Sequence, residues 1–169
     1  METLRRVLKG IDTFTRYQGY ALVPFCLLLI VITMYDIVGR QLGIFTAWAF
    51  DSEWFLYGFL MMMGMGYASL QGQHVRVDLA GSKLSPRMQS LFLVISFGVF
   101  VIPVLIIVGI DSWNFAMRAK KIGENVVSAW DFPLWPVKFS IFAGCCLMLP
   151  HSVAELIRHI YFVIRKEKL

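Results

Sequence analysis

The chain has 169 residues, of which 58% are hydrophobic and only 16% are charged. A soluble domain has about a quarter of its residues charged, and a soluble fold of this composition would leave too much apolar surface without cover. The composition therefore indicates a membrane protein. The net charge of +5 comes from residues between and outside the apolar runs. This placement favours an anionic membrane surface, and not nucleic acid, as the partner of the basic residues.

Residues 1–18 are predicted to form an amphipathic helix that lies in the plane of the lipid headgroups. Apolar residues recur at steps of three or four between Leu4 and Phe14, as expected for one face of a helix. The basic residues fall mostly on other positions of the helical wheel, where they would contact lipid phosphates. They are Arg5, Arg6, Lys9 and Arg16. A frayed basic tail is the alternative.

The first membrane span is predicted at residues 19–38. A basic start followed by an apolar run is also typical of a signal peptide, but this run is too long and no small-residue cleavage site follows it. The segment is therefore expected to stay as an anchor. Pro24 would lie in its first turn, where the missing amide costs little.

The second span is predicted at residues 53–70, with Glu53 at its outer end. A carboxylate there would cap the helix by interacting with the positive end of the helix dipole. Gly64 and Ala68 are spaced by four, which would allow another helix to pack closely. A polar segment, residues 71–87, is predicted to be a cytoplasmic loop.

The third span is predicted at residues 88–112, with a helix that can extend to 118. Pro103 lies inside it and is expected to kink it. A periplasmic connection at 119–133 leads to a fourth span at 134–157, and residues 158–169 form a cytoplasmic tail. The fold class is thus all-α, with four transmembrane helices and an interfacial N-terminal helix.

Four spans place both termini on one side of the membrane. Of the 16 Lys and Arg residues, eleven fall on that side and five on the other. The positive-inside rule then predicts that the N- and C-termini are cytoplasmic.

The sequence contains no recognisable catalytic or phosphate-binding motif, so neither an enzyme nor a cofactor or metal site is expected. A haem-binding electron-transfer subunit is one alternative, resting on His74, His151 and His159. A self-sufficient small proton-coupled exporter is another. That class requires a membrane-embedded acid, and Asp36 lies near the end of its span.

Several features in order resemble the small membrane subunit of tripartite ATP-independent periplasmic (TRAP) transporters, the DctQ-like family. An acid opens a glycine-dotted helix, and the string Gln73-His74-Val75-Arg76-Val77-Asp78 follows it. The later stretch Ser128-Ala129-Trp130-Asp131-Phe132-Pro133-Leu134-Trp135-Pro136, followed by Ala143-Gly144, resembles the entry of that family into its fourth helix. The resemblance covers nearly the whole chain.

The resemblance implies a multi-pass protein of the bacterial inner membrane that binds a large M-type subunit and works with a periplasmic substrate-binding protein. Such systems import organic anions and are driven by sodium. The large subunit would hold the sodium and substrate sites and move as an elevator. The small subunit would be a fixed, non-catalytic brace without a cofactor of its own.

The resemblance also suggests roles for single residues. His74, Arg76 and Asp78 would hold the cytoplasmic loop or contact the large subunit or lipid; a solvated loop is the alternative. Glu53 would contact the large subunit or the binding protein. Docking of the binding protein would involve the outer connection, which otherwise is a plain connector. The candidates there are Arg118, Lys120, Lys121, Glu124, Trp130 and Trp135.

Overall fold

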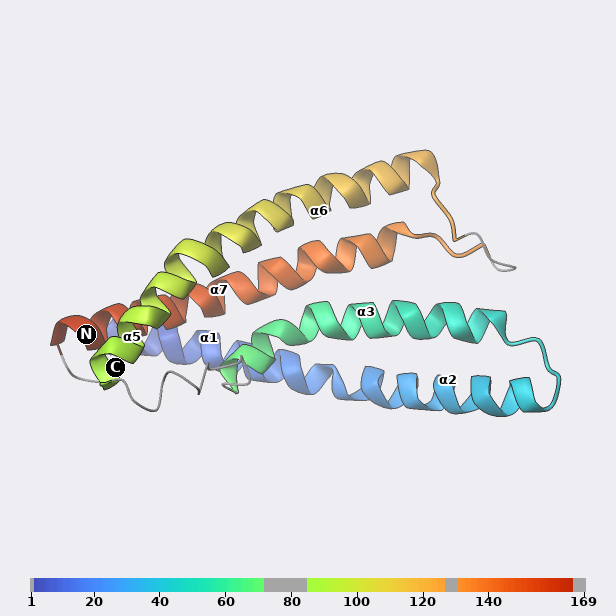
Figure 1. Ribbon diagram of the computed structural model, residues 1–169, viewed down its shortest axis with the longest axis horizontal. Coiled ribbons are helices and arrows are strands. Elements are labelled where there is room, and N and C mark those ends of the chain that lie inside the picture. The colour runs from blue at the N-terminus through green and yellow to red at the C-terminus, as the bar shows by residue number, and fades with distance from the viewer. Residues whose placement is uncertain (1, 72–84, 127–130, 166–169) are drawn as a thin grey trace.

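The computed structural model describes residues 2–71, 85–126 and 131–165 and shows helices joined by short turns (Figure 1). Within these residues no β-strand forms, although an isolated β-bridge joins Asn125 to Pro133. The predicted all-helical class is confirmed.

The chain runs back and forth along the long axis of the molecule, and each such run is called a pass below (Figure 1). The first pass consists of two helices, α1 (Glu2–Ala21) and α2 (Val23–Gln41), which follow one another almost in line (Figure 1). They are separated at Leu22, whose N–H donates to the carbonyl of Gly19 at 3.2 Å. Pro24 lies at the start of α2, as predicted. The forty residues rise about 60 Å, twice the hydrocarbon thickness of a bilayer.

The second pass is α3 (Ala47–Leu70), which begins six residues before the predicted start of its span. A tight turn precedes it. Gly43 adopts a left-handed φ of 73°, and the N–H of Ile44 donates to the carbonyl of Gly39 at 2.9 Å. Glu53 therefore lies in the second turn of α3, beyond the unpaired amides of the helix start. The predicted capping role of Glu53 is wrong.

The third pass is a continuous helical segment of three parts: α5 (Pro86–Ile95), the π-helical η1 (Ser96–Val101) and α6 (Ile102–Ile122). The hydroxyl of Ser85 accepts a bond from the N–H of Met88 at 3.5 Å and starts α5. The π turn lies directly before Pro103, which has no N–H to donate, and the pass bends there (Figure 1). α6 continues past the predicted limit and ends at Gly123, whose φ is 63°.

The fourth pass is α7 (Trp135–Arg165), which extends eight residues beyond the predicted end of its span. Across the molecule the passes lie in the order α2, α3, α7, α6, and each contacts its neighbour in this order (Figure 1). α1 contacts α3 and α7. α1 starts and α7 finishes at the same end of the molecule.

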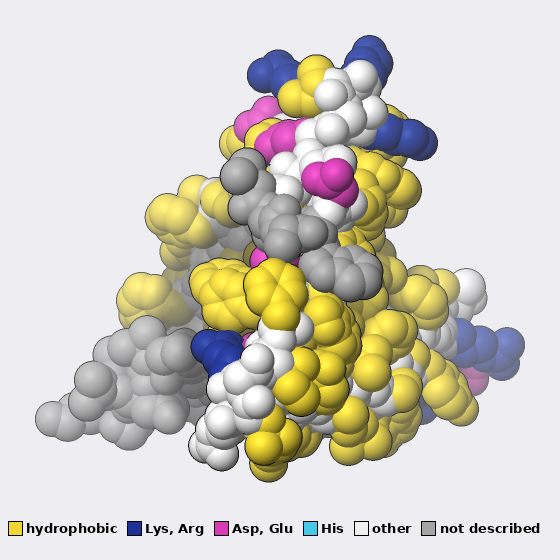
Figure 2. All heavy atoms as spheres, turned by 90° about the vertical axis from the view of Figure 1, so that its right-hand side faces the viewer, with side chains coloured by type: hydrophobic (Ala, Val, Ile, Leu, Met, Phe, Trp, Pro, Cys, Tyr) yellow, Lys and Arg dark blue, Asp and Glu magenta, His cyan; other side chains and the backbone are white. Residues whose placement is uncertain are grey.

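The core is small and lies between α6 and α7, where Leu105, Cys145 and Met148 are buried. Most large apolar side chains face outward instead, and they cover much of the end-on view in Figure 2. Three helical segments of the described chain are long and apolar enough to cross a membrane: Arg5–Gln41, Arg87–Ile122 and Trp135–Ile164. α3 is not among them, because its tyrosines, tryptophans, glycines and acids lower its hydropathy.

Candidate functional site

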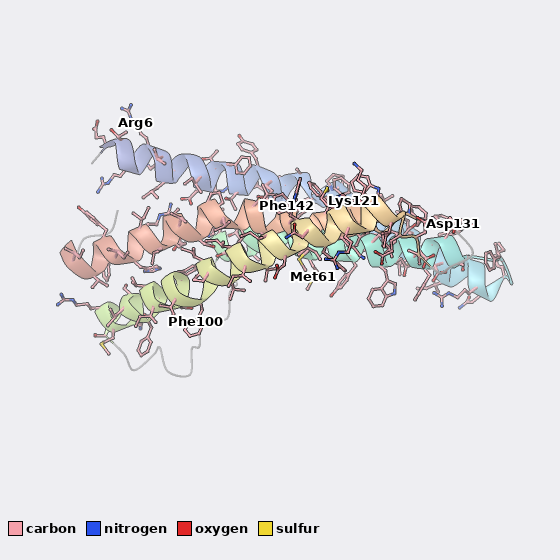
Figure 3. The ribbon with its side chains drawn as sticks, turned by 90° about the horizontal axis from the view of Figure 1, so that it is seen from above. Arg6, Met61, Phe100, Lys121, Asp131 and Phe142 are labelled. Atoms are coloured by element: carbon pink, nitrogen blue, oxygen red, sulfur yellow. The ribbon has the colours of Figure 1, made fainter. Side chains whose placement is uncertain are left out.

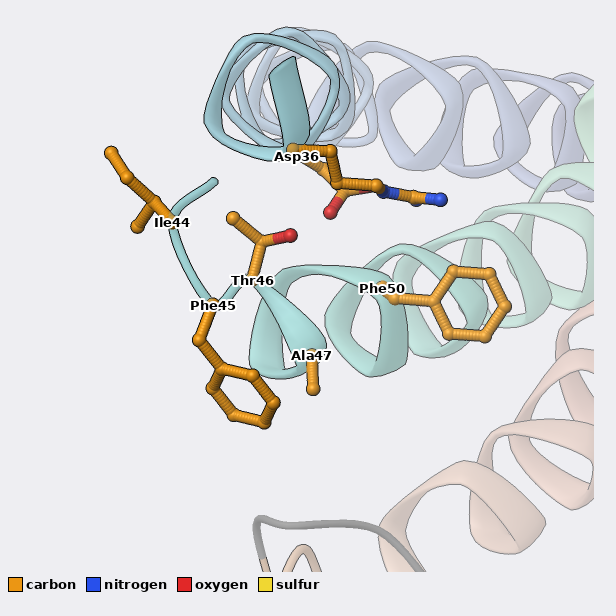
Figure 4. Close-up of a pocket in the computed structure, with 7 residues that line it drawn as sticks. Asp36, Ile44, Phe45, Thr46, Ala47 and Phe50 are labelled. Carbon is orange, nitrogen blue, oxygen red and sulfur yellow. The ribbon is translucent and has the colours of Figure 1, made fainter. Parts of the chain in front are cut away.

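The turn between α2 and α3 contains a shallow groove of about 430 Å³ (Figure 4). It is lined by Asp36, Arg40, Ile44, Phe45, Thr46, Ala47 and Phe50. In Figure 4 the side chain of Asp36 points from α2 toward α3, while Phe45 projects away from both helices. The groove is therefore an apolar hollow with one charged wall.

Asp36 and Arg40 form an ion pair one helical turn apart. The Asp36 side chain is 2% exposed and accepts a hydrogen bond from Arg40 through Oδ2. The guanidinium of Arg40 also lies over the ring of Phe50, 5.8 Å from its centroid. Asp36 Oδ1 is buried and has no hydrogen-bond partner among the described residues. Because one turn of α2 supplies both charges, the ion pair stabilises the end of α2, and the contact of Arg40 with Phe50 links this end to α3.

Glu53 and Asp51 are two further half-buried acids in the first turns of α3. One oxygen of each, Glu53 Oε1 and Asp51 Oδ2, is buried without a hydrogen-bond partner in the described part of the chain. Two ring contacts set the register of α3 against α2: Tyr35 with Trp48, at 5.3 Å between centroids, and Phe25 with Phe59, at 5.2 Å. Glu53 is thus level with about Ile30.

Ile30 lies well inside the apolar run of α2. On the other side of α3, α7 is only beginning at this level. Glu53, at the predicted start of its span, is thus level with the middle of α2. Hydropathy alone missed this, because it does not report how far neighbouring helices are staggered.

Several predicted docking residues come together where α6 ends and α7 begins. Lys138 on α7 pairs with Glu124 at 2.5 Å, and its ammonium lies 3.8 Å from the ring centroid of Phe115. Lys120 lies 5.0 Å from the ring centroid of Trp135. The N–H of Val126 donates to the carbonyl of Phe132 and the N–H of Leu134 to that of Glu124, both at 2.9 Å, and these bonds hold the two sides of the connection together.

The remaining cations of this end, Arg118 and Lys121, are exposed on α6. Lys and Arg side chains gather at the top of Figure 2, where α6 ends, and Lys121 and Asp131 lie toward this end in Figure 3. The structure thus brings Lys120, Lys121, Glu124 and Trp135 to one end of the molecule. Trp130 lies outside the described residues, as do His74, Arg76 and Asp78 of the predicted cytoplasmic loop.

At the opposite end, an ion-pair network that the sequence did not reveal joins α1 to α7. The guanidinium of Arg158 donates to Asp12 at 2.5 Å and to Glu155 at 2.6 Å, and it also reaches the carbonyl of Leu8 at 3.4 Å. His159 lies 3.4 Å from Glu155. Glu155, Arg158 and His159 show the i, i+3 and i+4 spacing of helix pairs, but no spacing indicates a partner 146 positions away.

The predicted headgroup-binding residues Arg5, Arg6, Lys9 and Arg16 are all exposed on α1. Figure 3 shows Arg6 at the end of the molecule opposite Lys121 and Asp131. Contact of these cations with lipid stays a prediction.

The closest packing between α3 and a neighbouring helix occurs at glycines other than the predicted pair Gly64 and Ala68. A Cβ at Gly64 would meet only Leu22, at 4.0 Å. α3 instead approaches α7 at Gly66, which faces the backbone of Leu147 and Met148 at 3.7 Å, and at Gly144, which lies against the backbone of Met62. Ala68 is half-buried. A spacing of four identifies the helix that packs closely but not which of its faces does so.

Among the residues described, no group of three or more His, Cys, Asp or Glu side chains is placed to hold a metal ion. His151 and His159 lie on the same helix, α7. The ion pairs Asp36–Arg40, Glu124–Lys138 and Asp12–Arg158 lie toward the ends of the molecule, and many large apolar side chains between them are exposed.

These features define a helical membrane protein with several long apolar helices. The family model described as the DctQ component of tripartite ATP-independent periplasmic transporters matches residues 29–161. The chain therefore belongs to this family, the small membrane subunits of TRAP transporters, as the sequence resemblance predicted. A DctQ component works with a large M subunit and a binding protein. Comparisons with curated proteins and with solved structures gave no match.

Proposed function

We propose that this chain is the fixed, non-catalytic brace of a sodium-driven TRAP transporter that imports an organic anion delivered by a periplasmic binding protein. Sodium and substrate bind the large subunit in this proposal, and the small subunit holds no cofactor. It is anchored in the bacterial inner membrane by four crossings, with both termini in the cytoplasm. α3 is the fourth crossing.

The observation that carries the proposal is the single layer α2–α3–α7–α6. A closed four-helix bundle buries one face of every helix around a common core, whereas a layer leaves both of its faces available to lipid or protein. The accessible surface is 11359 Å², against about 8,500 Å² for a compact monomer of this mass. A broad, thin protein suits the task of enlarging a partner in the membrane.

The layer also supports the four crossings. α2, α3, α6 and α7 alternate in direction along the chain, and α3 contacts α2 on one side and α7 on the other (Figure 1). A helix of 24 residues rises about 36 Å, which is enough to span the hydrocarbon core. Neighbours on both sides reduce its contact with lipid and compensate for its lower hydropathy.

The test is purification of the tagged chain from native membranes in mild detergent, with mass spectrometry of what co-elutes. We expect one large multi-span protein in stoichiometric amount. Reconstituted with that protein and the binding protein, the complex should take up an organic anion only when a sodium gradient is present. A chain that elutes alone and is active alone would contradict the proposal and favour the small exporter.

A further inference from the structure

α3 carries an outward-facing row of large side chains. Phe50, Trp54, Tyr57 and Met61 are 48%, 65%, 55% and 53% exposed. Their spacing of four, three and four residues places them on one side of the helix. These four side chains are called the α3 stripe below. Gly58 lies beside them, and a Cβ there would meet nothing within 4 Å, so the stripe includes an open notch.

The outward face of α6 has a different chemistry. Its exposed side chains include Val104, Ile106, Ile107 and Ile110, which suit contact with lipid chains. Trp, Tyr and Met, in contrast, are enriched in the centres of protein interfaces. α3 also falls short of the apolar character of the three other passes. Because lipid is a poor environment for such a helix, its free face is better covered by protein.

Two unpaired acids flank the stripe. At about 100° per residue, Asp51 and Glu53 lie on opposite sides of the row. Neither forms an ion pair within the described chain, and each has a buried oxygen without a hydrogen-bond donor. Burial of a carboxylate without a partner is costly. Both side chains are only partly buried, so a surface placed over the stripe is expected to supply N–H donors or positive charge to the part of each carboxylate that stays accessible.

We infer that the α3 stripe is the surface on which the large membrane subunit packs, with a cationic or N–H donor group of that subunit meeting Asp51 or Glu53. The outward faces of α2 and α6 are then left to lipid. This inference rests on the proposed function, because that function supplies the partner. It adds which helix face binds and what chemistry the partner presents.

A photo-crosslinking amino acid placed at Trp54, Tyr57 or Met61 tests the face directly in native membranes. Matched positions on α6, Val104 and Ile107, serve as controls with similar exposure. We expect cross-links to the large subunit from the α3 positions and none from α6. Cross-links from α6 alone, cross-links between two copies of this chain, or none from α3 in an intact complex would each overturn the inference while leaving the brace function standing.

The charge requirement is tested separately with Glu53→Gln in the same purification. We expect at least a fivefold loss of co-purified large subunit. Asp111→Asn removes an exposed carboxylate from α6 and is the control; it should keep recovery within twofold. If Glu53→Gln and Asp51→Asn each recover as much large subunit as the unaltered chain does, the donor assignment is overturned. Absence of any large subunit with the unaltered chain would instead refute the proposed function itself.

Discussion

Gly144 is a residue at which α7 lies close to the backbone of α3. A Cβ there would lie 2.5 Å from the carbonyl oxygen of Met62 and 2.8 Å from its carbonyl carbon. Two backbones cannot yield as a flexible side chain can, so a larger residue must separate the helices. We expect Gly144→Val to destabilise the isolated subunit by roughly 1–3 kcal/mol, measured by thermal unfolding in detergent.

Gly58→Val is the matched control for this substitution. It introduces the same side chain into a membrane helix at a site where a Cβ meets no atom within 4 Å. The cost of a β-branched residue in a helix is then common to both variants. An equal loss of stability in the two would show that propensity, not the close contact, is responsible.

Lys138 is a second residue whose replacement is expected to lower the stability of the protein. Its side chain is 12% exposed, pairs with Glu124 at 2.5 Å and lies over the ring of Phe115. Removing one member leaves the other charge in a partly buried site. A double-mutant cycle of Lys138→Met and Glu124→Gln should give a coupling free energy of about 1 kcal/mol in thermal unfolding. A coupling of zero would mean that solvent screens the pair completely.

At the scale of elements, α1 depends on one residue of α7. Arg158 reaches Asp12 and the carbonyl of Leu8 on α1 and is held by Glu155. Arg158→Gln removes the charge that joins these groups. Amide hydrogen exchange in α1 should become at least tenfold faster, because local opening of α1 no longer breaks an ion pair.

The control for this experiment is Arg16→Gln, which removes an exposed cation from α1 without breaking an ion pair in the described chain. Exchange in α6 serves as the internal reference, since α6 does not take part in the network. If α1 exchanges at the same rate in both variants, the apolar contacts of α1 with α3 hold it in place instead.

The helices themselves were largely predictable from the sequence. Apolar runs located the passes, and Pro24 and Pro103 marked a helix start and a distortion correctly. The start of α3 was missed because Asp51 and Glu53 interrupt the apolar pattern. Hydropathy reports preference for lipid, whereas a helix continues wherever its backbone bonds and neighbours support it.

The candidate site was less predictable, for a different reason. The pair Asp36–Arg40 has a spacing that the sequence displays. The link from Asp12 to Arg158 and the close approach of Gly144 to Met62 depend on how distant helices align. Register between helices is set by packing along their whole length, and no local pattern encodes it.

For the whole molecule, the proposed topology predicts which segments are reached from each side of the membrane. A membrane-impermeant thiol reagent applied to intact spheroplasts should label cysteines introduced at Ile44 and Glu124. It should label cysteines at Glu2 and Ile164 only after the membrane is opened. Labelling of positions 44 and 124 from opposite sides would show that α3 does not cross.

The single layer also has a consequence for the amount of this protein in the cell. A chain whose helices share no closed interior cannot hide its interacting surfaces when it is alone, and membrane proteases remove such unassembled subunits. We therefore expect its steady-state level to fall severalfold when the large subunit is deleted, while its transcript is unchanged, as quantitative immunoblotting would measure. Supply of the partner, and not the rate of synthesis, would then set how many copies persist.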